Sequence, residues 1–381
     1  MDFGISDEQR RLCEAATAFG REVLEPGIEE RERAGGFDRS LWRQSGEAGI
    51  LGAYVPTEYG GQGRDVLTTI LIMEALGAGC RDNGITLGLN GQMWAVQEPI
   101  LRFGTETQKQ RYLPPLCAGE WFGAHGMTEA TSGSDTFALQ TVAVRDGDDY
   151  LLSGTKIYIG LGPVCDVALI FAATDPDKGR WGISAFLVDG DTPGLTRGPA
   201  QRKMGLNTSP MGEVVMDECR VPADQRLGPE GAGLSIFNHS MEWERSFIFA
   251  SHVGSMARQL DEAVAHARGR RQFGQPIGRF QSVSNRIADM KLRLETCRLL
   301  LHKAAWMKDE GEDTKLISAL AKLQIGESFL ASSIETMRVH GGRGYMHEHG
   351  VERDLRDAAG GVIYSGTSDI QRQLIAKLLG L

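Results

Sequence analysis

The sequence has little that would place the chain in a membrane or an oxidising compartment. No apolar run approaches the roughly 20 residues that a membrane-spanning helix needs. The N-terminal stretch MDFGISDEQRRL is charged from Asp7 onward and has no apolar signal core. Six cysteines are scattered without any C-x-x-C spacing, which argues against a disulfide framework and a zinc knuckle. We therefore expect a cytoplasmic protein with reduced thiols and no metal site.

Excess positive charge is also missing. Lys and Arg number 41 against 50 Asp and Glu, which gives a net charge of −9 and disfavours general nucleic-acid binding. Hydrophobic residues make up 41% and charged residues 24%, as is usual for a soluble globular protein. A chain of 381 residues is long enough for two or three domains and a large core.

The local residue pattern changes twice along the chain. Residues 1–120 have a helical pattern, with Ser6 as a cap for a helix over Asp7–Val23, an apolar helix over 67–79, loops around Asn83–Asn90, and a helix ending at Pro114–Pro115. Residues 121–228 contain short β-branched and aromatic runs, which predict strands over 150–159, 164–173, 182–188 and 213–216. Residues 229–381 are helical again. Within them, apolar residues from Val283 to Leu301 recur at steps of four and three, which predicts one long packed helix.

The predicted fold class is therefore a multidomain α+β protein. It consists of an N-terminal helical bundle, a small central β-barrel or sandwich, and a C-terminal helical bundle. The β runs follow one another without intervening helices, so a doubly wound sheet is not expected.

The stretch IYSGTSDIQR, residues 363–372, raises the question of an active site. Ser368 and Gln371 form an S-x-x-Q pattern that predicts a capping box and a helix running toward Leu379. The N–H groups at such a helix start can hold an anion or a polar ligand. Ser365 lies just before it, between Tyr364 and Gly366. From these residues alone, a simple helix start and the floor of a site stay equally open.

Three further motifs carry candidate ligand contacts. GMTEATSGSD (126–135) offers the hydroxyls of Thr128, Ser132 and Ser134 to a phosphate or ring edge, although a polar turn is the simpler interpretation. GRRQFGQPIGRFQ (269–281) combines arginines with Phe273, which fits a pyrophosphate clamp or an ordinary basic helix cap. HGGRGYMHEHG (340–350) is outside the strand–turn–helix context of a dinucleotide motif and lacks zinc spacing. Its glycines suit close backbone approach to a bulky group, or a plain loop.

Glu244 is the most informative single residue. On a helix it neighbours Ser240, Met241, Phe247 and Ile248, so it projects from an apolar face, whereas Glu242 has polar neighbours and is expected in solvent. A buried carboxylate is costly unless it is paired or functional, and desolvation raises its pKa toward the range of a general base. A structural ion pair with an arginine of another helix is the alternative.

Taken together and in order, these motifs resemble the acyl-CoA dehydrogenase family of flavoproteins. The resemblance covers essentially the whole chain through MTEATSGSD, SGTKIYI, KMG…CRVP, ERSFIFASHVG, RRQFGQPIGRFQ, HGGRGY and IYSGTSDIQR. It implies a C-terminal four-helix bundle, FAD as cofactor, and a homotetramer in which each flavin touches two subunits. The cofactor-binding residues that it implies are Met127, Thr128, Ser134, Tyr158, Gly160, Arg270, Phe273, Gln281, Arg338, Gly341, Gly342, Thr367 and Asp369.

The family chemistry is α,β-desaturation of an acyl thioester, with α-proton abstraction by a carboxylate and hydride transfer to flavin N5. Many members carry this base in an IYEGTS motif, where this chain has Ser365. Another branch places the base on a helix before an arginine, and Glu244–Arg245 matches that pattern, so the resemblance also implies Glu244 as the catalytic residue. The substrate-binding residues that it implies are Ser134, Met241, Arg245, Tyr364, Ser365 and Gly366.

This sequence also departs from the family pattern at three other positions. Gly160 stands where a threonine is common, Ala130 replaces a proline, and Arg338 stands where glutamine is usual.

Three further stretches bear on the substrate. LIMEALGAGCRD, SIFNHSMEWE and the stretch 280–313 are similar to the branch that oxidises prolyl groups tethered to a peptidyl carrier protein. We therefore expect an acyl or aminoacyl thioester, either on a carrier protein or on CoA. The electron acceptor is a flavoprotein or oxygen. The alternatives are a short-chain acyl-CoA dehydrogenase, a flavin monooxygenase or oxidase on the same scaffold, and a non-catalytic scaffold protein.

Overall fold

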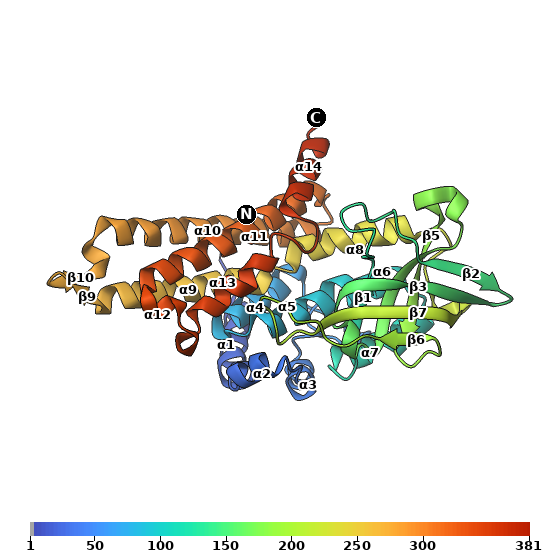
Figure 1. Ribbon diagram of the computed structural model, residues 1–381, viewed down its shortest axis with the longest axis horizontal. Helices are drawn as coiled ribbons and strands as arrows, with labels where there is room; N and C mark the ends of the chain where they lie inside the picture. The colour runs from blue at the N-terminus through green and yellow to red at the C-terminus, as the bar shows by residue number, and fades with distance from the viewer. Residues whose placement is uncertain (1–3) are drawn as a thin grey trace.

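The computed structural model describes residues 4–381 and has helices at both ends of the chain around a central sheet (Figure 1). The first helical region contains α1 (Asp7–Phe19), α2 (Ile28–Ala34), α3 (Arg39–Glu47), α4 (Val66–Gly79), α5 (Asn83–Gln92), α6 (Glu98–Phe103) and α7 (Glu106–Cys117). Ser6 caps α1, as predicted, and it forms a capping box with Gln9. The chain then continues as a π-helical turn over Gly20–Leu24, which accounts for the predicted end at Val23.

Two predictions in this region are wrong. Residues 83–90 form helix α5 instead of loops, because Asp82 caps it and the Asn83 amide hydrogen-bonds to the carboxylates of Asp354 and Asp357. Helix α7 runs through the proline pair to Cys117. Prolines lack an N–H but keep their carbonyls, and those of Pro114 and Pro115 accept hydrogen bonds from the next turn.

The central region is β, as predicted. Its strands are β1 (Gly123–Gly126), β2 (Val142–Asp146), β3 (Asp149–Gly160), β4 (Val167–Ala173), β5 (Ile183–Asp189), β6 (Leu195–Arg197), β7 (Met211–Pro222) and β8 (Arg226–Leu227). They form one mixed sheet in the order β6-β7-β3-β2-β4-β5-β8, with β1 added parallel to β4. Strands β4 and β5 are buried along nearly their whole length, which explains their continuous apolar runs.

The C-terminal region is a helical bundle. Its elements are α8 (Gly233–Phe247), α9 (Ala250–Gly269), the short hairpin β9 (Arg271–Gln272) and β10 (Gln275–Pro276), α10 (Gln281–Asp309), α11 (Lys315–His340), α12 (Gly342–Tyr345), α13 (Val351–Gly360) and α14 (Ser368–Leu378). The apolar stripe predicted from Val283 to Leu301 lies on α10 and buries Met290, Leu294, Cys297 and Leu301. The motif 340–350 contains α12 and a short 3₁₀ turn, so it is not the plain loop of the simpler interpretation.

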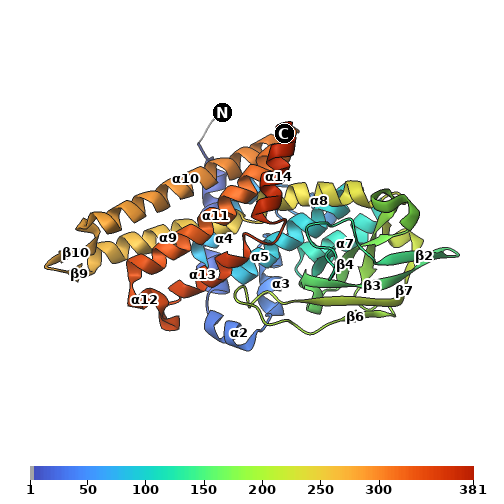
Figure 2. The same ribbon diagram turned by 45° about the horizontal axis from the view of Figure 1, so that its top comes forward.

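The bundle and the sheet lie at opposite ends of the molecule, with the first helices beneath the junction (Figures 1 and 2). One core joins helices α4 and α5 to α9, α10 and α11, and a second joins α6 and α7 to the sheet and to α8. Helix α8 therefore bridges the sheet and the bundle. Within residues 4–381, no helix is long and apolar enough to span a bilayer.

Candidate active site

Glu244 lies on α8 where this helix passes from the sheet to the bundle. The four neighbours that define its predicted apolar face, Ser240, Met241, Phe247 and Ile248, are all buried. Glu244 itself is partly exposed. The hydroxyl of Ser365, from the segment between α13 and α14, donates a hydrogen bond of 2.5 Å to Oε1 of Glu244. The carboxylate singled out on the helix and the serine singled out in IYSGTSDIQR therefore meet.

The surroundings make this carboxylate more basic than usual. Burial raises the pKa of Glu244, while the Ser365 hydrogen bond and the charges of Arg245 and Lys322 oppose the increase. Lys322 on α11 is buried and donates to the carbonyl of Gly361, and burial with the nearby Arg245 charge lowers its pKa to about 8. A carboxylate with a raised pKa is suited to general-base work near neutral pH.

The neighbouring Glu242 corrects a prediction. It is half-buried and accepts hydrogen bonds from Lys308 and Thr314 at the turn between α10 and α11. These contacts outweigh burial and hold the pKa of Glu242 below its ordinary value. Glu242 is thus a structural ion-pair partner and not a solvated surface group, because α8 packs against both of those helices.

The segment from Tyr364 to Thr367 is held in an unusual backbone conformation. Ser365 and Gly366 both have positive φ, at 56° and 85°. The side-chain amide of buried Gln371 donates to the carbonyls of both residues, at 3.4 Å and 3.1 Å. The Tyr364 ring stacks on Phe249 with centroids 5.4 Å apart. The fold therefore fixes where the Ser365 hydroxyl points.

The cap of α14 differs from the prediction by one residue. Thr367 is the N-cap, and its hydroxyl accepts from the N–H of Ile370. Ser368 is the first helical residue and is buried, so its hydroxyl does not cap the helix. Asp369 follows in the first turn, exposed and paired with Arg372. Thr367 and Asp369 thus stand at the helix start next to Ser365.

A second part of the site lies where β1 ends beside α8. Met127 packs in the same cluster as Met241 and Phe237 of α8, and His125 Nε2 lies 3.4 Å from Ser240 Oγ. The carbonyl of Thr128 accepts from the N–H of Ile157, which joins this loop to β3. The motif GMTEATSGSD therefore begins beside α8, the helix that carries Glu244.

The exposed face near this loop carries residues that suit a flat ligand. Tyr158 is 61% exposed with φ of 57°, and Gly160 has open space where a Cβ would stand. Ser134 is exposed in the loop. An exposed aromatic ring with free hydroxyls and a small residue fits the edge and face of a heteroaromatic group.

The remaining predicted cofactor residues lie at the far end of the bundle. Arg270 caps α9, Phe273 at the tip of the hairpin is 93% exposed, and Gln281 begins α10. Arg338 lies in the last turn of α11, before Gly341 and Gly342, and the stacked rings of His266 and His340 join the ends of α9 and α11. The hairpin and α12 lie together at this end, away from α8 (Figures 1 and 2). One chain thus separates the predicted residues into two groups.

The two groups have chemistry that suits the two halves of a dinucleotide. Residues 263–288 contain five arginines and no Asp or Glu, as a pyrophosphate site requires. The other group offers hydroxyls, an exposed aromatic ring and a helix start. In the part of the chain that the structure describes, no cluster of His, Cys, Asp or Glu is arranged to hold a metal ion, and all six cysteines are free.

Several residues of this region escaped prediction. The sequence pattern indicates Gln371 only as a capping partner, and it indicates no contacts for Lys322 and Lys156. Lys156 had a local signal, since it occupies a buried position in the alternating pattern of β3. Lys322 carries no such signal, because its partner Gly361 comes from a distant segment. Gln371 contacts Ser365 and Gly366 just before its own helix, and its capping pattern does not indicate these bonds.

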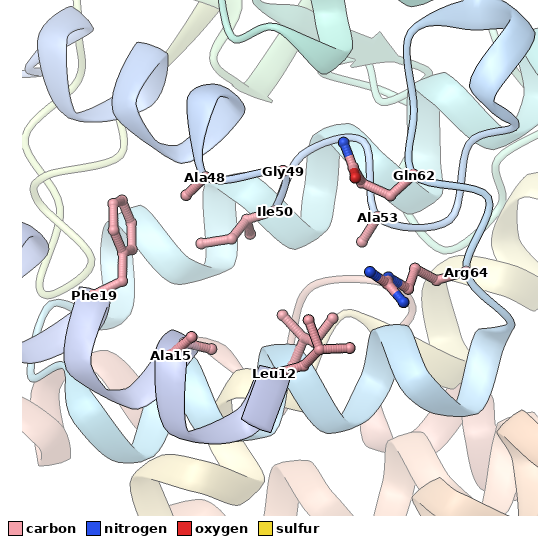
Figure 3. Close-up of a pocket in the computed structure, with 11 residues that line it drawn as sticks. Leu12, Ala15, Phe19, Ala48, Gly49, Ile50, Ala53, Gln62 and Arg64 are labelled. Carbon is pink, nitrogen blue, oxygen red and sulfur yellow. The ribbon is translucent and has the colours of Figure 1, made fainter. Parts of the chain in front are cut away.

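A separate hollow lies between α1 and residues 48–64 (Figure 3). It measures about 120 Å³ and has mostly apolar walls, with Gln62 and Arg64 on one side. None of the predicted site residues lines it. Glu244 and the segment 364–367 therefore remain the centre of the candidate site.

The site combines a basic carboxylate with loops and helix ends that suit a dinucleotide. This arrangement is typical of an oxidoreductase that removes a proton next to a bound cofactor. Residues 6–120, 124–219 and 231–380 match the N-terminal, middle and C-terminal domains of acyl-CoA dehydrogenases. The chain therefore belongs to the acyl-CoA dehydrogenase family.

Individual relatives and solved structures are similar to the chain over its whole length. The chain is 43% identical to L-prolyl-[peptidyl-carrier protein] dehydrogenase of Pseudomonas fluorescens over 382 residues, covering 100% of both chains. It is 38% identical to a short-chain specific acyl-CoA dehydrogenase of Megasphaera elsdenii, over 97% of each. Among solved structures, the prolyl acyl carrier protein oxidase AnaB has a TM-score of 0.98 at 43% identity, covering 99% of this chain and 100% of that one. PigA with FAD and proline has a TM-score of 0.97 at 40% identity, covering 100% of both.

Proposed function

We propose that this protein is an FAD-dependent dehydrogenase that oxidises the α,β bond of a prolyl thioester tethered to a peptidyl carrier protein. The observation that carries the proposal is the Glu244–Ser365 contact, which combines a basic carboxylate on α8 with a serine in IYSGTS. Full-length similarity to prolyl-carrier dehydrogenases, and to a structure that holds FAD and proline, supports this substrate.

In this reaction Glu244 removes the α proton of the thioester. Burial keeps the carboxylate basic, and Ser365 of the fixed segment 364–366 donates a hydrogen bond to it. Bound FAD supplies the acceptor for the hydride that leaves the β carbon. Met241, Arg245, Tyr364, Gly366 and Ser134 would surround the substrate.

Two subunits would complete each cofactor site. Met127, Thr128, Ser134, Tyr158 and Gly160, with Thr367 and Asp369, would hold the cofactor near Glu244. Arg270, Phe273, Gln281, Arg338, Gly341 and Gly342 would contribute from a neighbouring subunit. The exposed Phe273 and the exposed leucines 292 and 299, seven residues apart on α10, are apolar contacts of the kind that subunit interfaces cover. We propose a homotetramer on this basis.

The partners and the compartment belong to the same proposal. The peptidyl carrier protein would bring the prolyl group, and the electron acceptor would be a flavoprotein or oxygen. An electron-transferring flavoprotein structure similar to this chain supports the first acceptor, and the description of AnaB as an oxidase supports the second. Free cysteines fit a cytoplasmic location.

A short-chain acyl-CoA dehydrogenase is the second candidate, supported by the Megasphaera elsdenii relative. The two are separated by anaerobic mixing of the flavoprotein with prolyl-carrier protein, other aminoacyl-carrier proteins, prolyl-CoA and butyryl-CoA, each followed by flavin absorbance. Bleaching by prolyl-carrier protein alone, or at a much higher rate than by the others, is expected. Bleaching by butyryl-CoA without any by carrier-bound thioesters would overturn the proposal.

A further inference from the structure

The contact between Ser365 and Glu244 has a defined geometry. The serine hydroxyl donates to Oε1 of a residue that is 121 positions away in the chain. Within residues 4–381, Glu244 has no salt bridge and no other side-chain hydrogen bond, even though Arg245 and Lys322 lie close enough to affect its charge. Ser365 therefore determines the orientation of the Glu244 carboxylate.

The position of the hydroxyl is itself fixed by the fold. The side-chain amide of buried Gln371 donates to the carbonyls of Ser365 and Gly366. A Cβ at Gly366 would lie 2.7 Å from the amide nitrogen of Gln371. Tyr364 is anchored on Phe249. Such support from buried side chains is what a functional group needs to stay in one orientation.

We propose that Ser365 is a positioning residue that ties Oε1 of Glu244 and leaves Oε2 as the oxygen that accepts the substrate proton. A carboxylate oxygen that already accepts a hydrogen bond is the poorer base, and a fixed rotamer keeps the second oxygen at a constant place. This inference rests on the proposed function of Glu244 as base and adds a role for the serine.

The hydroxyl also affects the proton affinity of the base. The groups facing Glu244 are Arg245 on α8, Lys322 on α11, and Tyr364 and Ser365 on the segment before α14. Burial raises the pKa of Tyr364 well above its ordinary value, so its phenol stays neutral. Removing the hydroxyl leaves burial opposed only by the two cations, so the pKa of Glu244 rises further and the acid limb of the rate moves to higher pH.

The test compares Ser365→Gly and Ser365→Asn with the wild type. Glycine removes the hydroxyl and accepts the positive φ without strain, whereas asparagine keeps a donor and also tolerates this conformation. The rate of anaerobic flavin reduction by prolyl-carrier protein is measured across the pH range in which all variants keep FAD. For Ser365→Gly we expect the midpoint of the acid limb to move to higher pH, with a rate about tenfold lower below that midpoint. Ser365→Asn should restore the midpoint.

A second readout does not need turnover. The carbonyl stretch of protonated Glu244 is followed by infrared difference spectroscopy against pH, with Glu244→Gln as the blank. Its midpoint should also move to higher pH in Ser365→Gly. If Ser365→Gly does not fold, Ser365→Cys is measured instead. Cysteine has nearly the shape of serine, but its thiol is a weaker donor, so the midpoint should shift in the same direction.

The outcomes separate the two claims. If Glu244→Gln still reduces flavin at the wild-type rate, the assignment of the base is wrong and this inference falls with it. If Glu244→Gln abolishes reduction and Ser365→Gly leaves both midpoints unchanged, the base stands and the positioning role of Ser365 is overturned.

Discussion

The ammonium of Lys156 on β3 lies 2.7 Å from Oε1 of Glu129, and both side chains are buried. Lys156 also donates to the carbonyl of Met127, and the Glu129 carboxylate accepts from the backbone of Gln140 and Thr141. Burial lowers the pKa of Lys156 to about 8, and the lysine charge overcomes burial to hold the pKa of Glu129 below its ordinary value. The pair therefore fastens both ends of the loop 127–141 to the sheet.

Lys156→Met is expected to destabilise the protein by about 3–5 kcal/mol, because it leaves the Glu129 carboxylate buried without a partner. Loss of FAD should accompany it if the loop 127–141 holds the cofactor as proposed. The measurements are urea unfolding and the flavin-to-protein absorbance ratio. Lys291→Met is the matched control. It breaks an exposed pair with Glu295 on α10 and should cost less than about 1 kcal/mol. Equal losses in the two variants would contradict the structural role of the buried pair.

Glu244→Gln should retain the fold and FAD but reduce flavin about a hundredfold more slowly or worse, because the amide cannot take the α proton. Glu242→Gln, two residues away on the same helix, is the control. It weakens the contacts with Lys308 and Thr314 and should lower the unfolding midpoint slightly while changing the flavin reduction rate less than about threefold. Single-turnover stopped-flow measurement compares them, and the reverse pattern would move the base to Glu242.

The sequence was most informative where function depends on local pattern. The apolar neighbours of Glu244 single it out from the sequence, because the helical period alone decides which residues share a face. The long helix α10 followed from periodicity in the same way, and the strands followed from short β-branched and aromatic runs. The partner of Glu244 could not be found like this, because Ser365 reaches it only through the packing of two distant segments.

Two of the wrong predictions, on residues 83–90 and on Glu242, have the same physical origin. Residues 83–90 look like a loop because asparagine and glycine are weak helix formers, yet buried partners on α13 satisfy the Asn83 amide. Glu242 looks solvated because its neighbours on α8 are polar, yet two other helices supply its partners. In both cases a tertiary contact outweighs the local preference.

Gly254→Ala should destabilise the protein by about 2 kcal/mol or more, because α4 and α9 cross in backbone contact. A Cβ at this position would lie 1.8 Å from the carbonyl oxygen of Glu74, and backbone atoms in the core cannot move aside cheaply. Gly91→Ala is the control in helix α5, where nothing lies within 4 Å of the added atom. It should be neutral or stabilise by about 0.5–1 kcal/mol through helix propensity. Thermal unfolding measures both, and a harmless Gly254→Ala would contradict this helix crossing.

Asp354 and Asp357, one turn apart on α13, should affect the pH dependence of stability in opposite directions. Burial and the nearby charges of Asp354 and Glu32 raise the pKa of Asp357 from 3.8 to about 7. The folded state thus binds more protons at this site than the unfolded state between these values, so its contribution to stability falls as pH rises through that window. Asp354 is also buried, but the charge of Arg258 outweighs burial and lowers its pKa, so its contribution is present at neutral pH and is lost on acidification.

The free energy of unfolding, measured in urea at pH 5 and pH 8, should therefore respond differently in the two variants. Asp354→Asn should lose about 3 kcal/mol or more at pH 8, because Arg258 is left without its buried partner. Asp357→Asn removes the cost of ionising a buried carboxyl, so relative to wild type it should be more stable at pH 8 than at pH 5. Its new amide faces the Asn83 amide, which shifts both values downward by a similar amount and leaves the difference between them intact. A difference of zero, or of the opposite sign, would show that Asp357 is ionised in the folded protein across this range.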